Sequence, residues 1–422
     1  MVNPADIERA KQGRNVWNAW AEAAIEAAKS LHGVPADVDF INADISFSFE
    51  GFIFPGGASF VGAKFSWSKD TFKEAVFGHY VSFGRAEFDG SVSFERARFQ
   101  TSTFRRSIFK DDVTFEGAKF AGDDCQFDYA EFCGDANFEE ARFESSKIRF
   151  QHAQFKRAAR FRKACFHNPL DFSQAEFQRV ADFAQVTMKG GADFSWAIFD
   201  GVAAFEDCIA DRPPDFRTAR FRVAPNLHAS QIGYEPGNES FCRRLFRAAA
   251  DQHDVRRYRF LKKLAGDAKD HESEVAFLAL ELRAKRFHES KGFAAIALNL
   301  GYEWLSDFGR SVARPTVWLF AVTLSAATMI ACAHWTGLDD MLSNLSAIVT
   351  LAITNAALLV GSDKWTIRLD AWEQLCASSP HCKPKLLLGN LLGYVQSAFS
   401  LFLLFLIGLG LRNRFRAGGS SN

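Results

Sequence analysis

Phenylalanine recurs in the first half of this chain at a spacing that neither a helix nor a simple strand requires. Between residues 172 and 205 it stands at 172, 177, 183, 194, 199 and 205, and Met188 takes the one missing step. The gaps alternate between five and six residues, whereas an α-helix repeats a face every 3.6 residues and a strand every two. The spacing therefore indicates a repeat architecture.

The repeating unit is F-x-x-A-x-F, with a step of about eleven residues. Copies stand at residues 60–65, 72–77, 83–88, 94–99, 115–120, 127–132, 138–143, 150–155, 161–166, 172–177, 194–199 and 216–221. The residue two positions before a Phe is small or apolar, such as Ala181 or Ala192, and the positions between carry charged or amide side chains. Each segment thus points one large and one small side chain inward, which a right-angled β-coil satisfies.

Stacked coils are expected to lie about 4.8 Å apart, the spacing of neighbouring strands, so that the phenylalanine rings form ladders that exclude water. If two eleven-residue units make one coil, residues 49–221 give about eight coils. The core ladder predicted for the second half of the repeat contains Phe150, Phe161, Phe172, Phe183, Phe194, Phe205 and Phe216.

The segments "ADF" at 181–183 and 192–194 and "ANF" at 136–138 match a known repeat. They resemble the pentapeptide-repeat family, whose repeat A-(D/N)-(L/F)-x-x forms a right-handed quadrilateral β-helix. The resemblance covers about 180 residues and implies a mainly β solenoid. The six-residue segments depart from the family's five and predict a bulged or enlarged face.

The chain divides into four predicted parts. They are a capping helix (1–38), the β-helix (39–222), an amphipathic helical linker (223–312) and an α-helical transmembrane domain (313–422). A helix over residues 5–32 places Trp17 and Trp20 on one face, and we expect it to cover the raw end of the first coil.

Charge and motifs limit what the β-helix does. Fifty basic and fifty acidic residues leave the chain neutral, which argues against nucleic-acid binding and against a strongly acidic mimic of DNA. The β-helix shows no Ser-His-Asp order, no metal-spaced cluster and no phosphate loop, so we predict no enzyme and no cofactor. Arg157, Arg160, Arg162 and Lys163 form a candidate basic patch, either a solvated charged face or an anion site.

Three apolar stretches follow near the C-terminus. Residues 315–335 and 386–411 are each long enough to span a bilayer. Residues 343–361 are long enough as well but carry Ser, Asn and Thr, and they form a re-entrant helix or a third span. The linker and the entry to the first span resemble bacterial pentapeptide-repeat membrane proteins.

Arginines flank the two spans and favour two crossings. Arg310 and Arg314 precede the first span, and Arg412, Arg414 and Arg416 follow the last. Two crossings place both groups in the cytoplasm, as the positive-inside rule requires. Basic residues between the spans, among them Lys364 and Arg368, argue for the three-crossing alternative.

A span, a polar half-helix and a second span resemble a two-span pore-loop channel. The stretch "LLVGSD" (358–363) resembles the filter of potassium channels but lacks its Thr and its second Gly. The candidate pore-lining residues are Thr350, Thr354, Asn355, Gly361, Ser362 and Asp363. Cys376 and Cys382 are a candidate disulfide if their loop is periplasmic, and a metal site with His381 is the alternative.

The sequence thus predicts a bacterial inner-membrane protein with its solenoid in the cytoplasm. The favoured hypothesis is a homo-oligomer, such as a tetramer, with a channel-like membrane domain. Its solenoid would sense or dock a cytosolic protein partner. The alternative is a membrane-tethered scaffold that conducts no ions. Besides lipid and that partner we expect no ligand, and no nucleic acid.

Overall fold

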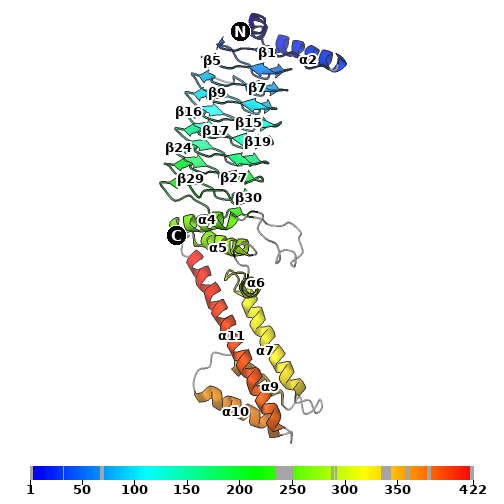
Figure 1. The fold of residues 1–422 in the computed structure, drawn as a ribbon, viewed down its shortest axis with the longest axis vertical. Helices are drawn as coiled ribbons and strands as arrows, with labels where there is room; N and C mark the ends of the chain where they lie inside the picture. The colour runs from blue at the N-terminus through cyan, green and yellow to red at the C-terminus, as the bar shows by residue number, and fades with distance from the viewer. Residues whose placement is uncertain are drawn as a thin grey trace. The chain divides into compact units, whose positions relative to one another are not determined.

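The computed structural model describes residues 3–31, 33–66, 71–233, 251, 253–286, 289, 292–333, 344–356, 362–377 and 382–418. The chain divides into two compact units, Met1–Ala284 and Lys285–Asn422. The first unit holds a β-solenoid with helices at its two ends, and the named helices of the second are α6 to α11 (Figure 1).

Four sheets of parallel strands form the faces of the solenoid. Face 1 contains β1 (Val38–Asp39), β4 (Ala58–Ser59), β7 (Val81–Ser82), β11 (Ser102–Thr103), β15 (Asp124–Gln126), β19 (Lys147–Arg149), β23 (Leu170–Asp171) and β27 (Ala192–Asp193). Face 2 contains β2 (Asp44–Ile45), β5 (Lys64–Phe65), β8 (Glu87–Phe88), β12 (Ile108–Phe109), β16 (Glu131–Phe132), β20 (Gln154–Phe155), β24 (Glu176–Phe177), β28 (Ile198–Phe199) and β31 (Arg220–Phe221).

The other two sheets complete each coil. Face 3 contains β9 (Val92–Ser93), β13 (Val113–Thr114), β17 (Ala136–Asn137), β21 (Ala159–Arg160), β25 (Ala181–Asp182) and β29 (Ala203–Ala204). Face 4 contains β3 (Ile53–Phe54), β6 (Val76–Phe77), β10 (Arg98–Phe99), β14 (Lys119–Phe120), β18 (Arg142–Phe143), β22 (Cys165–Phe166), β26 (Thr187–Met188), β30 (Ile209–Ala210) and β32 (Gln231–Ile232).

The solenoid is longer than the phenylalanine pattern indicated. Faces 2 and 4 each have nine strands, which correspond to about nine coils rather than eight. Beyond the predicted end at residue 222, the chain continues in register: Ile232 pairs with Ala210, and Leu227 is fully buried. The repeat continues there with Leu and Ile in the place of Phe. A search for Phe alone misses these residues and therefore ends the solenoid too early.

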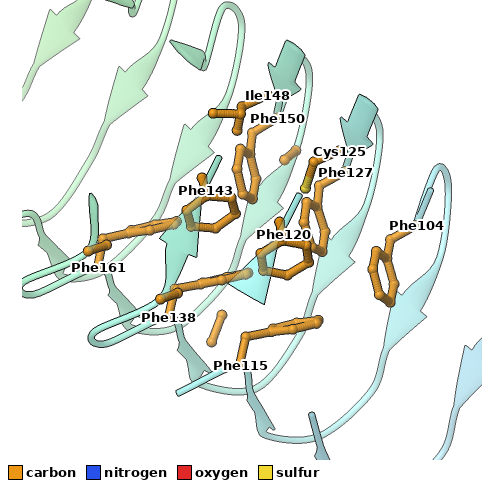
Figure 2. Close-up of a cluster of buried hydrophobic side chains, with 14 of the residues drawn as sticks. Phe104, Phe115, Phe120, Cys125, Phe127, Phe138, Phe143, Ile148, Phe150 and Phe161 are labelled. Atoms are coloured by element: carbon orange, nitrogen blue, oxygen red, sulfur yellow. The ribbon is translucent and has the colours of Figure 1, made fainter. Parts of the chain in front are cut away.

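In most coils one phenylalanine from each face lies in the core, and rings of successive coils stack (Figure 2). Phe127 lies between Phe104 and Phe150 on face 1, with ring centroids 4.7 Å apart on both sides. The predicted core ladder is buried, but it separates into two. Phe150, Phe172, Phe194 and Phe216 stack on face 1, while Phe161, Phe183 and Phe205 stack on face 3. An eleven-residue step is half a coil, so consecutive units lie on opposite faces.

The F-x-x-A unit forms the corner that joins one face to the next. The amide of Ala86 donates to the carbonyl of Phe83 at 3.0 Å, and Arg85 between them has a φ of +59°. A positive φ at the third residue is the geometry of a type II turn. Met188 lies on face 4 in register with Phe166, as its place in the spacing predicts.

Two helices, not one, cover the first coil. Helix α1 (Pro4–Lys11) and helix α2 (Arg14–Leu31) are separated at Gly13, whose φ is +91°. Trp17 of α2 is fully buried and donates from Nε1 to the carbonyl of Ile53 at 2.8 Å. Asn18 accepts from the Ile53 amide, so the side chains of α2 satisfy backbone groups that a strand of a preceding coil would otherwise pair.

The predicted linker is divided between the two units. Helix α4 (Asp254–Asp267) and helix α5 (His271–Lys285) pack on the core of the first unit through Val255, Leu261 and Phe277. They cover the last coil as α2 covers the first, because both open ends of a solenoid carry apolar side chains. Helix α6 (Phe293–Ser306) belongs to the second unit.

The second unit continues with four further named helices. They are α7 (Ala313–Ala333), α9 (Leu345–Ala356), α10 (Ser362–Ala377) and α11 (Cys382–Gly418). Two stretches, Ala313–Cys332 and Leu391–Arg416, are long and apolar enough to span a membrane. The twelve residues of α9 reach about 18 Å, less than the hydrocarbon core of a bilayer. Helix α10 was not predicted.

Candidate functional site

Charged side chains on the solenoid pair between neighbouring coils. The pairs and their N–O distances include Lys73–Glu95 (3.0 Å), Lys119–Glu144 (3.0 Å), Arg149–Asp124 (3.1 Å), Arg160–Asp135 (2.8 Å) and Lys163–Glu140 (3.3 Å), together with Lys156–Glu131. Residues one coil apart in sequence face each other across the spacing of neighbouring strands. Exposed pairs contribute little to stability, but they leave this surface without a strong field of one sign.

These pairs divide the candidate basic patch. Arg160 and Lys163 are bound to carboxylates of the preceding coil. Arg157 and Arg162 are exposed, and no ion pair is found for either among the described residues. Two arginines beside neutralised neighbours favour the solvated-face interpretation of the patch over an anion site.

The corners of the solenoid carry side chains in the left-handed conformation. The corner between faces 1 and 2 carries Arg85, Arg106, Tyr129, His152, Gln174 and Trp196, and the corner between faces 3 and 4 carries Glu74, Arg96, Glu140, Lys163, Gln185 and Asp207. A positive φ is uncommon for residues other than glycine and is most unusual for bulky ones. Aromatic side chains at these positions occur only at the first corner, among the described turns.

The aromatic corner is a candidate interaction surface. The rings of Tyr129 and His152 stack at 4.5 Å, and the Arg106 guanidinium lies 5.5 Å from the Tyr129 ring. Trp196 leaves 62% of its surface exposed. Exposed Trp, Tyr and Arg are the residue types that dominate binding energy at protein interfaces. Sequence reasoning missed this surface, although aromatic residues in the variable x-x positions of the unit are a signal for it.

The cysteines of the solenoid core do not form a reactive site. Cys125 and Cys208 are fully buried. Burial raises the pKa of the Cys208 thiol to about 12 and also raises the pKa of the Cys125 thiol. Both therefore stay protonated at neutral pH and pack as small apolar groups. No cluster of three His, Cys, Asp or Glu residues suited to a metal ion occurs in the described part of the chain.

A network of charges joins the last coil to α4. Asp215 accepts from Arg217 at 2.6 Å and pairs with Arg257 at 3.4 Å. Arg257 also bonds Asp251 and Asp254 at 2.9 Å. Burial by itself would raise the pKa of Asp215, but hydrogen bonds from the side chain and backbone of Arg217 hold it below its ordinary value. The arrangement holds the cap in place.

The second unit exposes many large apolar side chains and buries several polar ones beside its small apolar cores. Large apolar side chains of α7 and α11 are exposed, among them Val317, Phe320, Leu324, Val395, Phe402 and Phe405. On α9, Leu345, Val349 and Ile353 are exposed, whereas Thr354 and Asn355 are buried. Gln396 and Ser400 of α11 are buried as well. Water would favour the opposite arrangement, in which apolar side chains lie inside.

The candidate pore-lining residues that the structure describes lie in the helix packing of this unit. The hydroxyl of Thr354 donates to the carbonyl of Thr350 in its own helix at 2.7 Å. Asn355 lies against Gly393 of α11, where its Nδ2 is 3.1 Å from the point that a Cβ would occupy. Gly361 and the side chains of Ser362 and Asp363 lie outside the described residues.

A buried polar cluster surrounds Gly393. Nη2 of Arg368 lies 3.0 Å from the same Cβ point, and its guanidinium is 5.5 Å from the Tyr394 ring. One turn further along α11, Gln396 donates to the carbonyl of Ala352 at 2.9 Å. The absence of a side chain at Gly393 lets Arg368 and Asn355 approach α11 closely. Sequence reasoning noted Arg368 only as a loop charge, because α10 was not predicted.

The candidate disulfide is described on one side only. Cys376, near the end of α10, is disulfide-bonded. The side chain of its predicted partner Cys382 lies outside the described residues, as does His381 of the alternative metal site.

Comparisons with known proteins bear on the solenoid. A family model described as Pentapeptide repeats, with nine copies, matches the chain over residues 49–97, 72–119, 83–131, 104–147, 115–165, 127–175, 150–197 and 172–220. Neither the curated proteins nor the solved structures give a match to this chain. The matched residues all lie within the stacked coils.

Proposed function

The chain belongs to the pentapeptide-repeat family through its solenoid, and from that premise we propose that it is a membrane-tethered interaction protein. The solenoid is a cytoplasmic rod that docks a protein partner. The helices of the second unit hold it at the inner membrane of a bacterium.

The observation that carries this proposal is the polarity of the second unit. Its two long helices expose Phe and Leu side chains, and its buried positions include Gln396, Ser400 and Asn355 beside apolar side chains. Polar groups inside and apolar groups outside are stable only where the surroundings are hydrocarbon. Two helices of spanning length supply the crossings.

The docking role is supported by the aromatic corner. The solenoid is built on a core of stacked rings and a surface of paired charges, and these features suit a rigid, soluble rod. Tyr129, His152 and Trp196 do not contribute to that core, and Tyr129 and Trp196 are exposed on its surface. Exposed aromatic side chains are enriched where a protein binds another protein.

The tethering is tested by fractionating a bacterial host that expresses the full chain. We expect the protein to stay with the membranes after alkaline extraction. An impermeant maleimide should label an Arg157→Cys variant more than the natural chain, which has cysteines of its own, in inverted vesicles, and no more than the natural chain in intact spheroplasts. Release by alkali contradicts the membrane proposal, and added labelling of the variant in spheroplasts contradicts the cytoplasmic placement.

A second candidate function is ion conduction by an oligomer. It is favoured by the polar cluster of Arg368, Asn355 and Gln396, because a buried ionisable group among lipid-facing helices is costly and usually functional. Single-channel recording from the full-length protein in a planar bilayer tests it. Discrete currents that change in Asn355→Ala support conduction. The absence of current from a folded oligomer favours the membrane-tethered interaction protein.

A further inference from the structure

The second unit gathers arginines at the end where α7 begins and α11 ends. The residues are Arg310 and Arg314, from the start of α7 and the loop before it, and Arg412, Arg414 and Arg416, from the last turns of α11. All are exposed. They come from segments about a hundred positions apart in the chain, so their proximity is a property of the fold and needs a structural cause.

The cause is a strained loop that is joined to α11. Asp307, Phe308 and Gly309 follow one another with φ of +50°, +56° and +79°. Such a run persists only where the surroundings hold it. Phe308 is buried and packs edge-to-face on Tyr302 at 5.5 Å.

Two contacts fix this loop to the end of α11. Nδ2 of Asn413 donates to the carbonyl of Gly309 at 3.1 Å. A Cβ on Gly410 would lie 3.1 Å from Cγ2 of Val312, which shows how closely the helix passes the loop. Asn413 stands between Arg412 and Arg414, so the same bond that joins the segments brings their arginines to one surface.

Most of these arginines are available to a ligand. Arg314 lies 3.9 Å from Asp307. For Arg310, Arg412, Arg414 and Arg416 no ion pair is found in the part of the chain that the structure describes. This differs from the solenoid, where basic side chains repeatedly pair with a carboxylate one coil away.

Aromatic side chains flank the arginines. Trp304 is 47% exposed and packs against Trp318 with ring centroids 4.3 Å apart, and Phe415 is 78% exposed. Trp at the end of a spanning helix is the usual marker of the level of the lipid headgroups. Guanidinium groups at that level meet phosphate groups, which they bind through paired hydrogen bonds.

We propose that this surface, the arginine collar (Arg310, Arg314, Arg412, Arg414 and Arg416), binds the headgroups of anionic phospholipids. The inference rests on the proposed membrane insertion. It adds that the loop at Asp307–Gly309 and Asn413 build one site from two segments, and that the ligand is a lipid phosphate with a net negative charge.

The test uses the full chain reconstituted in vesicles of phosphatidylcholine alone and with an equal part of phosphatidylglycerol. Lipids that stay bound after extraction are measured by mass spectrometry. We define enrichment as the ratio of phosphatidylglycerol to phosphatidylcholine among the bound lipids divided by the same ratio in the bulk, and we expect it to exceed one severalfold. The triple variant Arg412→Gln, Arg414→Gln, Arg416→Gln should reduce that enrichment by at least about fivefold. About fivefold is the effect expected from the loss of a single arginine at the membrane surface, and it serves here as the lower bound for three.

A matched control removes the same charge elsewhere. Arg157→Gln, Arg162→Gln, Arg179→Gln changes three exposed arginines of the solenoid and should leave the enrichment unchanged. Equal loss in both triple variants overturns the proposal, because the preference then follows net charge. Inorganic phosphate should not displace the lipid at the same ionic strength, and full displacement overturns the assignment to a lipid.

Asn413→Ala tests the site without changing any charge. It provides an independent test if the triple variant does not insert into vesicles. We expect a reduction of about twofold or more in the enrichment, because the arginines of α11 lose their link to the loop. Gly408→Ala is its control on the same helix, since a Cβ there meets nothing within 4 Å. Equal enrichment in both overturns the two-segment site. A chain that fails to enter vesicles refutes the membrane proposal, whereas one that enters without lipid preference refutes this inference alone.

Discussion

The solenoid and the helical unit differ in where they place aromatic and polar side chains. In the solenoid, Phe127 and its stacked neighbours are fully buried while charged side chains outside pair from coil to coil. In the helical unit, Phe320 and Phe405 are exposed while Gln396 and Asn355 are buried. If the helical unit inserts in a membrane as proposed, the surrounding solvent accounts for the difference, because lipid does not drive apolar side chains inside.

The largest effect should come from removing one ring of the core ladder. Phe127→Ala deletes a side chain stacked on both sides, and we expect it to lower the free energy of unfolding of the solenoid by about 3–5 kcal/mol. Phe405→Ala makes the same change at a side chain that is 65% exposed, and its cost should stay within about 0.5 kcal/mol. Urea unfolding of the full-length protein in detergent measures both costs, with the β-sheet signal reporting on the solenoid and the α-helical signal on the second unit. Equal costs would break the comparison.

A charge introduced on the exposed apolar surface of the helical unit tests whether that surface faces lipid. Leu324→Asp lies near the middle of α7, where an aspartate in hydrocarbon costs about 2.5–3.5 kcal/mol of insertion free energy. The fraction of protein that alkali releases from membranes should therefore rise several-fold. Val202→Asp, at an apolar residue of the solenoid that is 53% exposed against 68% for Leu324, should release no more than the natural chain. If the two variants behave alike, the helical unit does not face lipid.

The cap network gives a smaller, pH-dependent effect in the first unit. The pKa of Asp215 is lowered on folding, so its charged form stabilises the folded state above the ordinary Asp pKa, and this contribution is lost as the pH falls through the lowered value. Asp215→Asn should cost about 1.5–3 kcal/mol at neutral pH.

Denaturant midpoints between pH 7 and pH 2 test this prediction. The variant and the natural chain should converge at the acidic end, where Asp215 is protonated in both states. A cost that is the same at every pH would show that the carboxylate charge is not what matters.

Much of the solenoid can be predicted from the sequence, because each coil repeats the same local pattern of inward Phe and small residues. The spacing of Phe and Ala predicts the parallel solenoid, and Met188 takes the place that the pattern leaves for it. The ends are less predictable. Ile232 and Leu227 continue the core without Phe, and the break between α1 and α2 depends on one glycine at position 13.

The candidate sites depend on contacts that no local pattern encodes. The basic patch looks concentrated in sequence, but carboxylates one coil away, such as Asp135, neutralise part of it. The cluster around Gly393 requires α10, whose residues 362–377 carry no strong apolar periodicity. The arginine collar joins residues about a hundred positions apart. The sequence therefore predicts the repeats well, but it predicts poorly which polar side chains come into contact in the tertiary structure.

The smallest effect should come from the charges on the solenoid surface. Lys119 and Glu144 lie 3.0 Å apart with 47% and 36% of their side chains exposed. Water screens such a pair, and a double-mutant cycle with Lys119→Gln and Glu144→Gln should give a coupling of about 0–1 kcal/mol that molar salt removes. A coupling above about 2 kcal/mol would mean that the pair is shielded from water. Water would then not reach all the charged side chains of the solenoid. The contrast with the helical unit would weaken, because the contrast requires that the charged surface of the solenoid is in contact with water.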